Sequence, residues 1–194
     1  METILLNLTK MLTERKFLDN KKFDENYKKI LKQNTNERIF KIKSDFSNDE
    51  YHIMIIYGKI SSIKKIQGLD AFITNAENKN KIFIGNNISQ KAFKQFVDLS
   101  KSEVFFEYEL MMNIIEHELQ PKFELLTDEE KNVKLKEYNL NINNLQIMLK
   151  TDPIARYYNA KPGDVFRIIR PSPYTGMGFS YRRVLESSVS NIYA

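Results

Sequence analysis

The stretch "TDPIARYYNAKPGDVFRIIRPS" (Thr151–Ser172) decides how the C-terminal part of this 194-residue chain folds. Asp152 followed by Pro153 predicts a helix start, because aspartate can cap the first turn and proline there sacrifices no hydrogen bond. Asn159 can end that helix in the left-handed conformation, and Pro162–Gly163 suits the central positions of a type II turn. These residues have local structural roles, so the stretch is not predicted to be a phosphate-binding or catalytic loop.

The residues after that turn predict a β-hairpin. The run "DVFRIIR" (164–170) is typical of a strand, with Val165 and either Ile168 or Ile169 facing inward. Two glycines then mark a turn, and "FSYRRVL" (179–185) is expected to be the returning strand. The C-terminal third is therefore predicted to contain two helices followed by a β-hairpin.

Two further helix starts are marked by capping residues. Thr127 and Glu130 match a capping box, in which each side chain accepts the backbone N–H of the other residue. Ser89 is expected to cap a second helix, which covers "QKAFKQFVDL" (90–99).

Strands alternate with helices between residues 38 and 107. Apolar residues at near-helical spacing predict a helix over 61–76, between two of the strands, although the segment contains Gly68. The strand-like runs are "ERIFKIK" (37–43), "YHIMIIYG" (51–58) and "KIFIG" (81–85). Such alternation is typical of a small α/β layer. We predict the α+β fold class, with a small α/β domain over residues 1–113 and a compact α+β domain with a C-terminal β-hairpin over residues 114–194.

The composition limits which chemistry the chain can perform. Cysteine is absent, so no disulfide, thiolate metal site or cysteine nucleophile can form. The N-terminus lacks the segments of a signal peptide, and no apolar run approaches the roughly 18 residues of a membrane helix. We therefore expect a soluble intracellular protein. The formal net charge of +5 fits contact with a polyanion and equally a solvated surface that is rich in lysine. Five of the seven arginines lie in residues 150–194, and arginine favours planar partners such as carboxylates and phosphates.

The sequence contains no motif for common catalytic sites. The patterns GxxxxGK[ST], GxGxxG and GxSxG are absent. His117 lies between Glu116 and Glu118, but neighbours in sequence do not share one face of a helix or strand. Asp49 and Glu77–Lys79 match the letters of a magnesium-dependent nuclease, yet Glu77 falls in a polar loop. We predict no catalytic residue, no metal site and no cofactor, so the residues indicate a binding module.

Several ordered motifs resemble a known family. The runs "ELMMNIIEHELQPKFELLTDEE", "DPIARYY", "AKPGDVFRIIRPS" and "SYRRV", within Glu109–Leu185, closely resemble the fifth-subunit family of multisubunit DNA-directed RNA polymerases, which has an archaeal counterpart. Residues 1–108 resemble the jaw domain of the eukaryotic-type protein more weakly, best at "SSIKKIQGLDAF".

The resemblance implies a non-catalytic polymerase subunit. In that family the N-terminal jaw domain has a restriction-endonuclease-like fold without the active site and lies beside downstream double-stranded DNA. The C-terminal assembly domain docks on the largest subunit, near the sixth. The family implies no cofactor, no membrane contact and no homo-oligomer, and a location in the nucleus if the source is cellular, or in the virion and host cytoplasm if it is viral. The alternative is a free-standing DNA-binding or inactive-nuclease-like protein, which the Lys-rich N-terminal half favours.

The positions that match the family, taken with the clustered arginines, give the predicted site residues. The predicted subunit interface consists of Glu116, His117, Glu118, Pro121, Arg156, Tyr157, Arg167, Arg170 and Arg182. The family's DNA-proximal helix start corresponds to "SQKA" (89–92), so the predicted DNA-proximal residues are Ser89, Lys91 and Lys94.

The chain departs from the family pattern at several positions. Lys131 and Arg183 stand where the family is apolar or aliphatic, and Asn159 stands where glycine is usual. A tail over 186–194 runs past the usual end. Together with abundant Lys, Asn and Ile, these departures favour a large DNA virus over a protist as the source.

Overall fold

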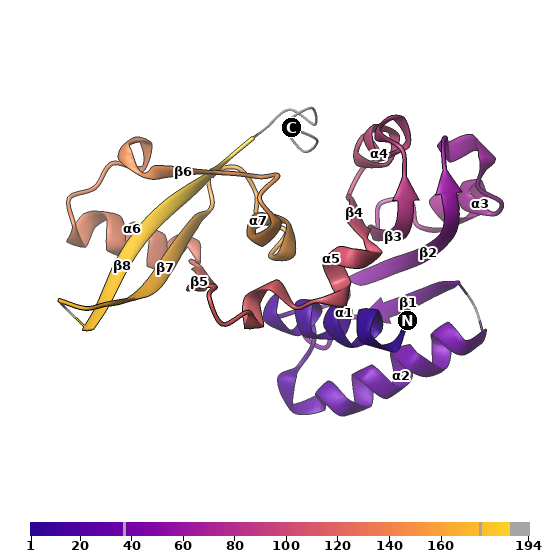
Figure 1. Ribbon diagram of the computed structural model, residues 1–194, viewed down its shortest axis with the longest axis horizontal. Coiled ribbons are helices and arrows are strands. Elements are labelled where there is room, and N and C mark those ends of the chain that lie inside the picture. Colours follow the sequence, from indigo (N-terminus) through magenta and orange to yellow (C-terminus); the bar gives the residue numbers. More distant parts are fainter. Residues whose placement is uncertain (37, 175, 187–194) are drawn as a thin grey trace. The chain divides into compact units, whose positions relative to one another are not determined.

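The computed structural model describes residues 1–36, 38–174 and 176–186. The chain divides into two compact units, of which the first is Met1–Asn113 and the second begins at Ile114 (Figure 1). Most of the tail, over 187–194, lies outside the described residues. No helix among the described residues is long and apolar enough to cross a membrane.

The first unit is built from one four-stranded sheet and several helices. Its elements are, in chain order, α1 (Glu2–Glu14), η1 (Asn20–Lys22), α2 (Phe23–Asn36), β1 (Ile39–Lys43), β2 (Glu50–Ile60), η2 (Ile63–Lys65), α3 (Leu69–Asn75), β3 (Asn80–Ile88), α4 (Gln90–Val97), β4 (Ser102–Phe106) and α5 (Glu107–Met111). The strand order is β1-β2-β3-β4. Strand β1 is antiparallel to β2, whereas β2, β3 and β4 run parallel.

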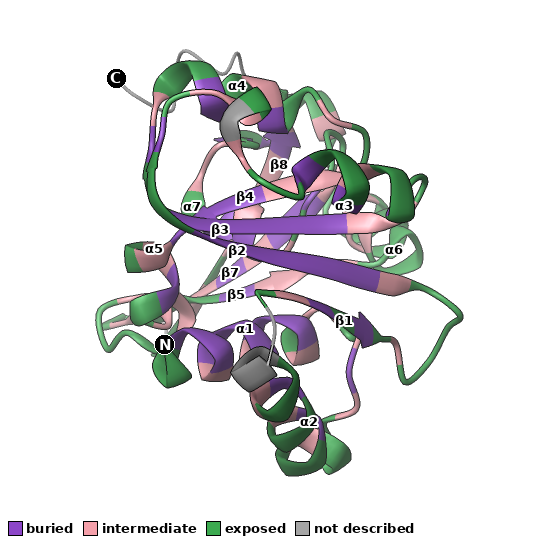
Figure 2. Ribbon diagram, turned by 90° about the vertical axis from the view of Figure 1, so that its right-hand side faces the viewer, coloured by how far each residue is buried: buried purple, intermediate pink, exposed green. Residues whose placement is uncertain are grey.

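The two central strands are covered on both faces. Residues 51–56 of β2 and 81–85 of β3 are buried without interruption, as expected for parallel strands between two helical layers. Figure 2 shows α1 and α2 on one side of these strands and α3 and α4 on the other. The ring of Phe83 in β3 contacts Phe72 of α3 and Phe96 of α4, with centroids 5.5 and 4.5 Å apart. The three strands predicted in this unit are therefore confirmed.

One helix prediction in the first unit needs correction. The run at 61–76 does not form a continuous helix, because only the short turn η2 precedes Gly68 and α3 begins after it. Gly68 has a φ of +80°, a left-handed conformation that a right-handed helix cannot pass through. The cap at Ser89 is confirmed, since its Oγ accepts the N–H of Ala92 at 3.3 Å at the start of α4.

The second unit is a four-stranded mixed sheet with a helix on each face (Figure 1). Its elements are η3 (Ile114–Glu116), β5 (Lys122–Leu125), α6 (Asp128–Glu137), η4 (Ile142–Asn144), β6 (Gln146–Leu149), α7 (Pro153–Tyr157), β7 (Val165–Ser172) and β8 (Gly176–Leu185). The strand order is β5-β7-β8-β6. Strands β5 and β8 are antiparallel to β7, and β6 is parallel to β8.

The predicted hairpin is confirmed as β7 and β8, but two strands were missed. Strands β5 and β6 complete the sheet on either side of the hairpin. Between the two inward candidates in β7, Ile168 is the buried one and Ile169 is half-buried. The core of the unit combines Phe123, Met148, Ile154, Ala155, Ala160, Phe166, Ile168 and Val184. The α+β class is confirmed, with two mixed sheets.

The local signals around α7 are also confirmed. Asp152 Oδ1 accepts the N–H of Ile154 at 2.9 Å, and Pro153 occupies the first turn. Asn159 has a φ of +51°, so it ends the helix in the left-handed region. Gly163 has a φ of +93° within the tight turn that leads to β7.

Candidate docking surface and nucleic-acid interface

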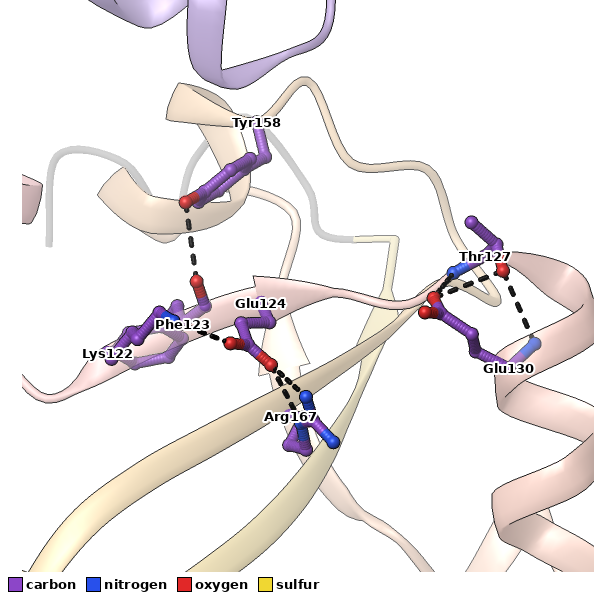
Figure 3. Close-up of polar contacts among 7 residues, drawn as sticks. All are labelled: Lys122, Phe123, Glu124, Thr127, Glu130, Tyr158 and Arg167. Atoms are coloured by element: carbon purple, nitrogen blue, oxygen red, sulfur yellow. Dashed lines mark hydrogen bonds and ion pairs between the residues drawn. The ribbon is translucent and has the colours of Figure 1, made fainter.

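A charged cluster joins β5 to β7 on one face of the second sheet (Figure 3). Glu124 lies opposite Arg167 in the ladder, and its Oε2 accepts the Nε–H of Arg167 at 2.8 Å. Its Oε1 lies 2.8 Å from Lys122 Nζ. Hydrogen bonds from Lys122 and then from Arg167 hold the pKa of Glu124 below its ordinary value. Arg167, predicted to face a partner, is therefore already paired inside its own unit.

Helix α7 is held against the sheet by its aromatic side chains. The hydroxyl of Tyr158 donates to the carbonyl of Phe123 in β5 at 3.3 Å (Figure 3). Tyr157, which was predicted to lie in the subunit interface, is only 6% exposed. This side chain is buried, and its burial corrects the prediction of a surface contact.

The capping box fixes the start of α6. Thr127 N–H donates to Glu130 Oε2 at 2.9 Å, and Glu130 N–H donates to Thr127 Oγ at 3.3 Å (Figure 3). Lys131, which stands where the family is apolar, forms an ion pair with Asp128 at 2.5 Å. The predicted cap is therefore present, and a polar contact replaces the apolar one at position 131.

The other predicted interface residues lie at or near the surface of the second unit. Glu116, His117 and Glu118 are exposed around the end of η3. His117 Nδ1 accepts the N–H of Leu119 at 3.2 Å, which stabilises the loop, and Leu119 is 86% exposed. Arg170 is exposed on β7. The half-buried members of the set are Pro121, Arg156 and Arg182.

An exposed apolar surface on the β7–β8 hairpin was missed by the sequence analysis. Ile169 pairs with Phe179 and Pro171 pairs with Met177, so these four side chains share one face of the sheet. Phe179 is 57% exposed and Met177 is 55% exposed. The alternating run "GMGFSY" carried a weak signal, but which of its faces is covered depends on how α6 packs. This hairpin surface adds an apolar component to the charged candidates.

Basic side chains gather at the start of α4 in the first unit. Lys91 and Lys94 are exposed on the helix. The hydroxyl of Ser89 is already used in hydrogen bonds within the first unit, because its Oγ donates to the carbonyl of Ser61 at 3.1 Å and also caps the helix. Gln95 Oε1 accepts the N–H of Ile63 at 3.3 Å, which brings η2 beside α4. The exposed lysines of this end are Lys59, Lys64, Lys91 and Lys94.

The letters that match a nuclease do not assemble into a site. Asp49 accepts the Ser47 hydroxyl at 2.9 Å in an exposed turn, whereas Lys79 Nζ lies 3.4 Å from Glu50. Glu77 is exposed in the turn after α3. Within residues 1–36, 38–174 and 176–186, no group of three or more His, Asp or Glu side chains is arranged to hold a metal ion.

Comparisons with known proteins place the chain in a family. The family described as RNA polymerase Rpb5, C-terminal domain, matches residues 112–184. Almost the whole chain is similar to the DNA-directed RNA polymerase subunit 5 of Acanthamoeba polyphaga mimivirus, with 33% identity over 190 residues that cover 94% of this chain and 90% of the relative. The chain belongs to the RNA polymerase subunit 5 family.

Other relatives in the subunit 5 family cover different shares of the chain. The subunit rpabc1 of RNA polymerases I, II and III from Dictyostelium discoideum is 29% identical over 180 residues, which cover 89% of this chain and 90% of that protein. The subunit Rpo5 of Thermofilum pendens is 47% identical over 74 residues, which cover 92% of that protein but 38% of this chain. Nearly the full length of this archaeal relative therefore corresponds to less than half of the present chain.

Membership in the subunit 5 family answers what kind of protein this is. The chain is a subunit of a multisubunit DNA-directed RNA polymerase, and members of the family are non-catalytic subunits. The resemblance drawn from the motifs in Glu109–Leu185 is confirmed, and one of the relatives is viral.

Proposed function

We propose that the second unit docks on the largest subunit of the polymerase, near the sixth, and that the first unit lies beside downstream double-stranded DNA. The observation that carries this proposal is the similarity to a polymerase subunit 5 along nearly the entire chain. The second unit is then the assembly domain and the first the jaw domain. A cellular source implies a nuclear location, and a viral source implies the virion and the host cytoplasm.

The surface of the second unit supports a docking role. Exposed charge at Glu116–Glu118 and Arg170 accompanies the apolar hairpin surface of Ile169, Pro171, Met177 and Phe179. Apolar centres surrounded by polar groups, with arginine enriched, are typical of protein interfaces. Tyr157 is buried and Arg167 is paired with Glu124, so we assign the main contacts to the exposed residues of the set.

Co-purification tests the docking proposal. We expect the tagged full-length chain, expressed in its native source, to bring down the two largest polymerase subunits in stable proportion through high-salt washing. A chain that purifies alone, or that releases its partners without any effect on polymerase activity, contradicts the proposal.

The lysines of the α4 end support a position near DNA. Lys59, Lys64, Lys91 and Lys94 form a small exposed basic group, and lysine side chains contact phosphates without reading sequence. We expect Lys91→Glu with Lys94→Glu to weaken the polymerase's hold on downstream DNA and to lower the salt dependence by about one unit of slope per lost phosphate contact.

A matched variant makes the DNA test specific. Lys28→Glu with Lys29→Glu places the same charge change on exposed positions of α2. The measurement is the salt dependence of binding between the assembled polymerase and a downstream duplex, with photocrosslinking from position 91. Equal effects of the two double variants, or no crosslink to DNA, contradict a position of the α4 end beside the duplex.

A further inference from the structure

Strand β6 differs from the other edge strands in its charge. Each four-stranded sheet has two edges, and in the described part of the chain three of these edge strands carry charged residues. These charged residues are Lys41 and Lys43 in β1, Glu103 in β4, and Lys122 and Glu124 in β5. Strand β6 reads "QIML" and has none. Charged side chains discourage an edge from pairing with another chain, and β6 is the edge strand that lacks them.

The backbone of β6 offers hydrogen-bonding groups on its outer side. Lys150 N–H donates to Leu185 C=O at 2.9 Å, and alternate residues of a parallel strand bond to the same neighbour. The backbone groups of Ile147 and Leu149 therefore point away from β8. Leu149 C=O accepts the N–H of Asp152 at 2.9 Å, whereas the ladder geometry leaves the N–H and C=O of Ile147 and the N–H of Leu149 on the side away from β8.

The side chains of β6 add an apolar surface to that edge. Ile147 is 55% exposed and Leu149 is 41% exposed, and both lie on the same face of the strand. Met148 points the other way and is 3% exposed, because it packs in the core of the unit. The strand is thus anchored through Met148 and presents the residues on either side of it to the surroundings.

Arg183 lies opposite Ile147 in the ladder, and its positive charge indicates that a binding segment would carry a negative charge. Arg183 of β8 pairs with Ile147, and its Nη1 donates to the amide oxygen of Asn143 at 2.7 Å rather than to a carboxylate. Its Nε is buried and has no hydrogen-bond partner among the described residues, so the terminal nitrogens are the part of this cation that an outside group would meet. A cation next to an apolar edge favours a segment that combines apolar residues with an acidic one.

We propose that β6 binds an extended segment of another polymerase subunit, which adds to the sheet as a fifth strand. The segment carries alternate apolar residues against Ile147 and Leu149 and a carboxylate near Arg183. Backbone pairing supplies affinity and the two side chains supply specificity, as in other cases of strand addition. This inference rests on the proposed function, since it names the mode by which part of the second unit contacts its partner.

Two variants of one residue separate backbone pairing from folding. Ile147→Pro removes an outward N–H that makes no ladder bond, which an edge strand tolerates, and Ile147→Lys keeps the backbone but adds an edge charge. We expect each to reduce co-purification of the full-length chain with the largest subunit by about tenfold or more, equivalent to about 1.4 kcal/mol. Val133→Lys, at a 61% exposed position of α6, is the matched control and should assemble normally.

Amide hydrogen exchange measures directly whether the outer edge of β6 is hydrogen-bonded. In the purified polymerase, the amides of Ile147 and Leu149 should be protected, whereas in the free chain they should exchange rapidly. The strand-addition proposal is overturned if both Ile147 variants assemble normally and the amides of Ile147 and Leu149 are unprotected in the wild-type polymerase. That result leaves the docking function intact. Failure of the wild-type chain to assemble overturns both.

Two other occupants of the β6 edge, the tail of this chain and a second copy of it, would each give a different experimental result. If removal of residues 187–194 exposes amides that were already protected in the free chain, the tail of this chain occupies β6. If the free chain forms a dimer that Ile147→Lys converts to a monomer, a second copy occupies it. Either result overturns a different polymerase subunit as the occupant.

Discussion

The guanidinium of Arg15 and the carboxylate of Glu103 form a two-point ion pair inside the first unit. Nη1 lies 3.0 Å from Oε1, and Nη2 lies 2.7 Å from Oε2. The two side chains are 5% and 14% exposed, and Arg15 also donates to the hydroxyl of Tyr51 at 3.2 Å. The pair ties the end of α1 to β4, two segments separated by 88 positions in the sequence.

Breaking this pair from one side should strongly destabilise the first unit. Arg15→Met leaves the largely covered carboxylate of Glu103 without its partner, and the loss of one member of a fully buried pair costs about 3–5 kcal/mol. We expect a large fall in the melting temperature of Arg15→Met. The double variant Arg15→Met with Glu103→Leu should recover much of it, because an apolar pair has no unpaired charge. A double variant as unstable as the single one would argue against this explanation.

The two isoleucines of β7 should respond oppositely to a charge. Ile168 is fully buried in the core, so Ile168→Asp places an unpaired carboxylate there at a cost of several kcal/mol and should unfold the second unit. Ile169 lies on the other face and is half-buried, so Ile169→Asp should fold. Thermal unfolding followed by circular dichroism compares the two, and similar melting curves would contradict the assigned faces.

Charge reversal on the docking surface should affect assembly more than folding. Arg170 is exposed and Arg156 is half-buried, so Arg170→Glu and Arg156→Glu should both reduce co-purification with the largest subunit, and the exposed variant Arg170→Glu should change the melting temperature little. Lys136→Glu on α6 serves as the exposed control. A large loss of melting temperature with normal assembly would reassign these arginines to intramolecular roles.

Glu124 should make the second unit sensitive to acid. Hydrogen bonds from Lys122 and Arg167 lower its pKa below the ordinary 4.5. A carboxylate with a lowered folded-state pKa stabilises the fold above the ordinary value, and this contribution is lost as the pH falls through the lowered pKa. The melting temperatures of wild type and Glu124→Gln should therefore differ at neutral pH and converge once the pH falls below the lowered pKa of Glu124.

A second glutamine variant controls for the change of residue type. Glu118→Gln alters an exposed carboxylate near η3. Because this side chain is exposed, Glu118→Gln should change the melting temperature little at neutral pH. If the effect of Glu124→Gln is independent of pH, the pairing with Lys122 and Arg167 does not contribute to stability.

The candidate site could be predicted only in part. The exposed residues Glu116–Glu118 and Arg170 follow from motif positions, and they lie at the surface. Tyr157 matches a family motif and Arg167 is one of the clustered arginines, yet the first is buried and the second is paired with Glu124. Sequence spacing shows that a residue lies on a strand or helix, but it does not show whether a neighbour from elsewhere in the chain covers or binds it.

The sequence by itself determined the features whose partners are a few residues away. The caps at Ser89, Thr127 and Asp152 and the left-handed stop at Asn159 were read correctly, because donor and acceptor lie within three residues of each other or a single backbone angle is involved. The ordered motifs also identified the family, because matching them compares only the order of residues along the chain and needs no knowledge of contacts in space.

Only the tertiary structure decided which short segments became strands. Segments β5 and β6 have four residues each, too few to show a clear period, and they become strands because β7 and β8 supply their hydrogen-bond partners. Those partners lie more than 30 residues away, as with Phe123 and Ile168 or Ile147 and Arg183. A strand exists only when another strand satisfies its backbone, so such pairing cannot be read from either segment alone.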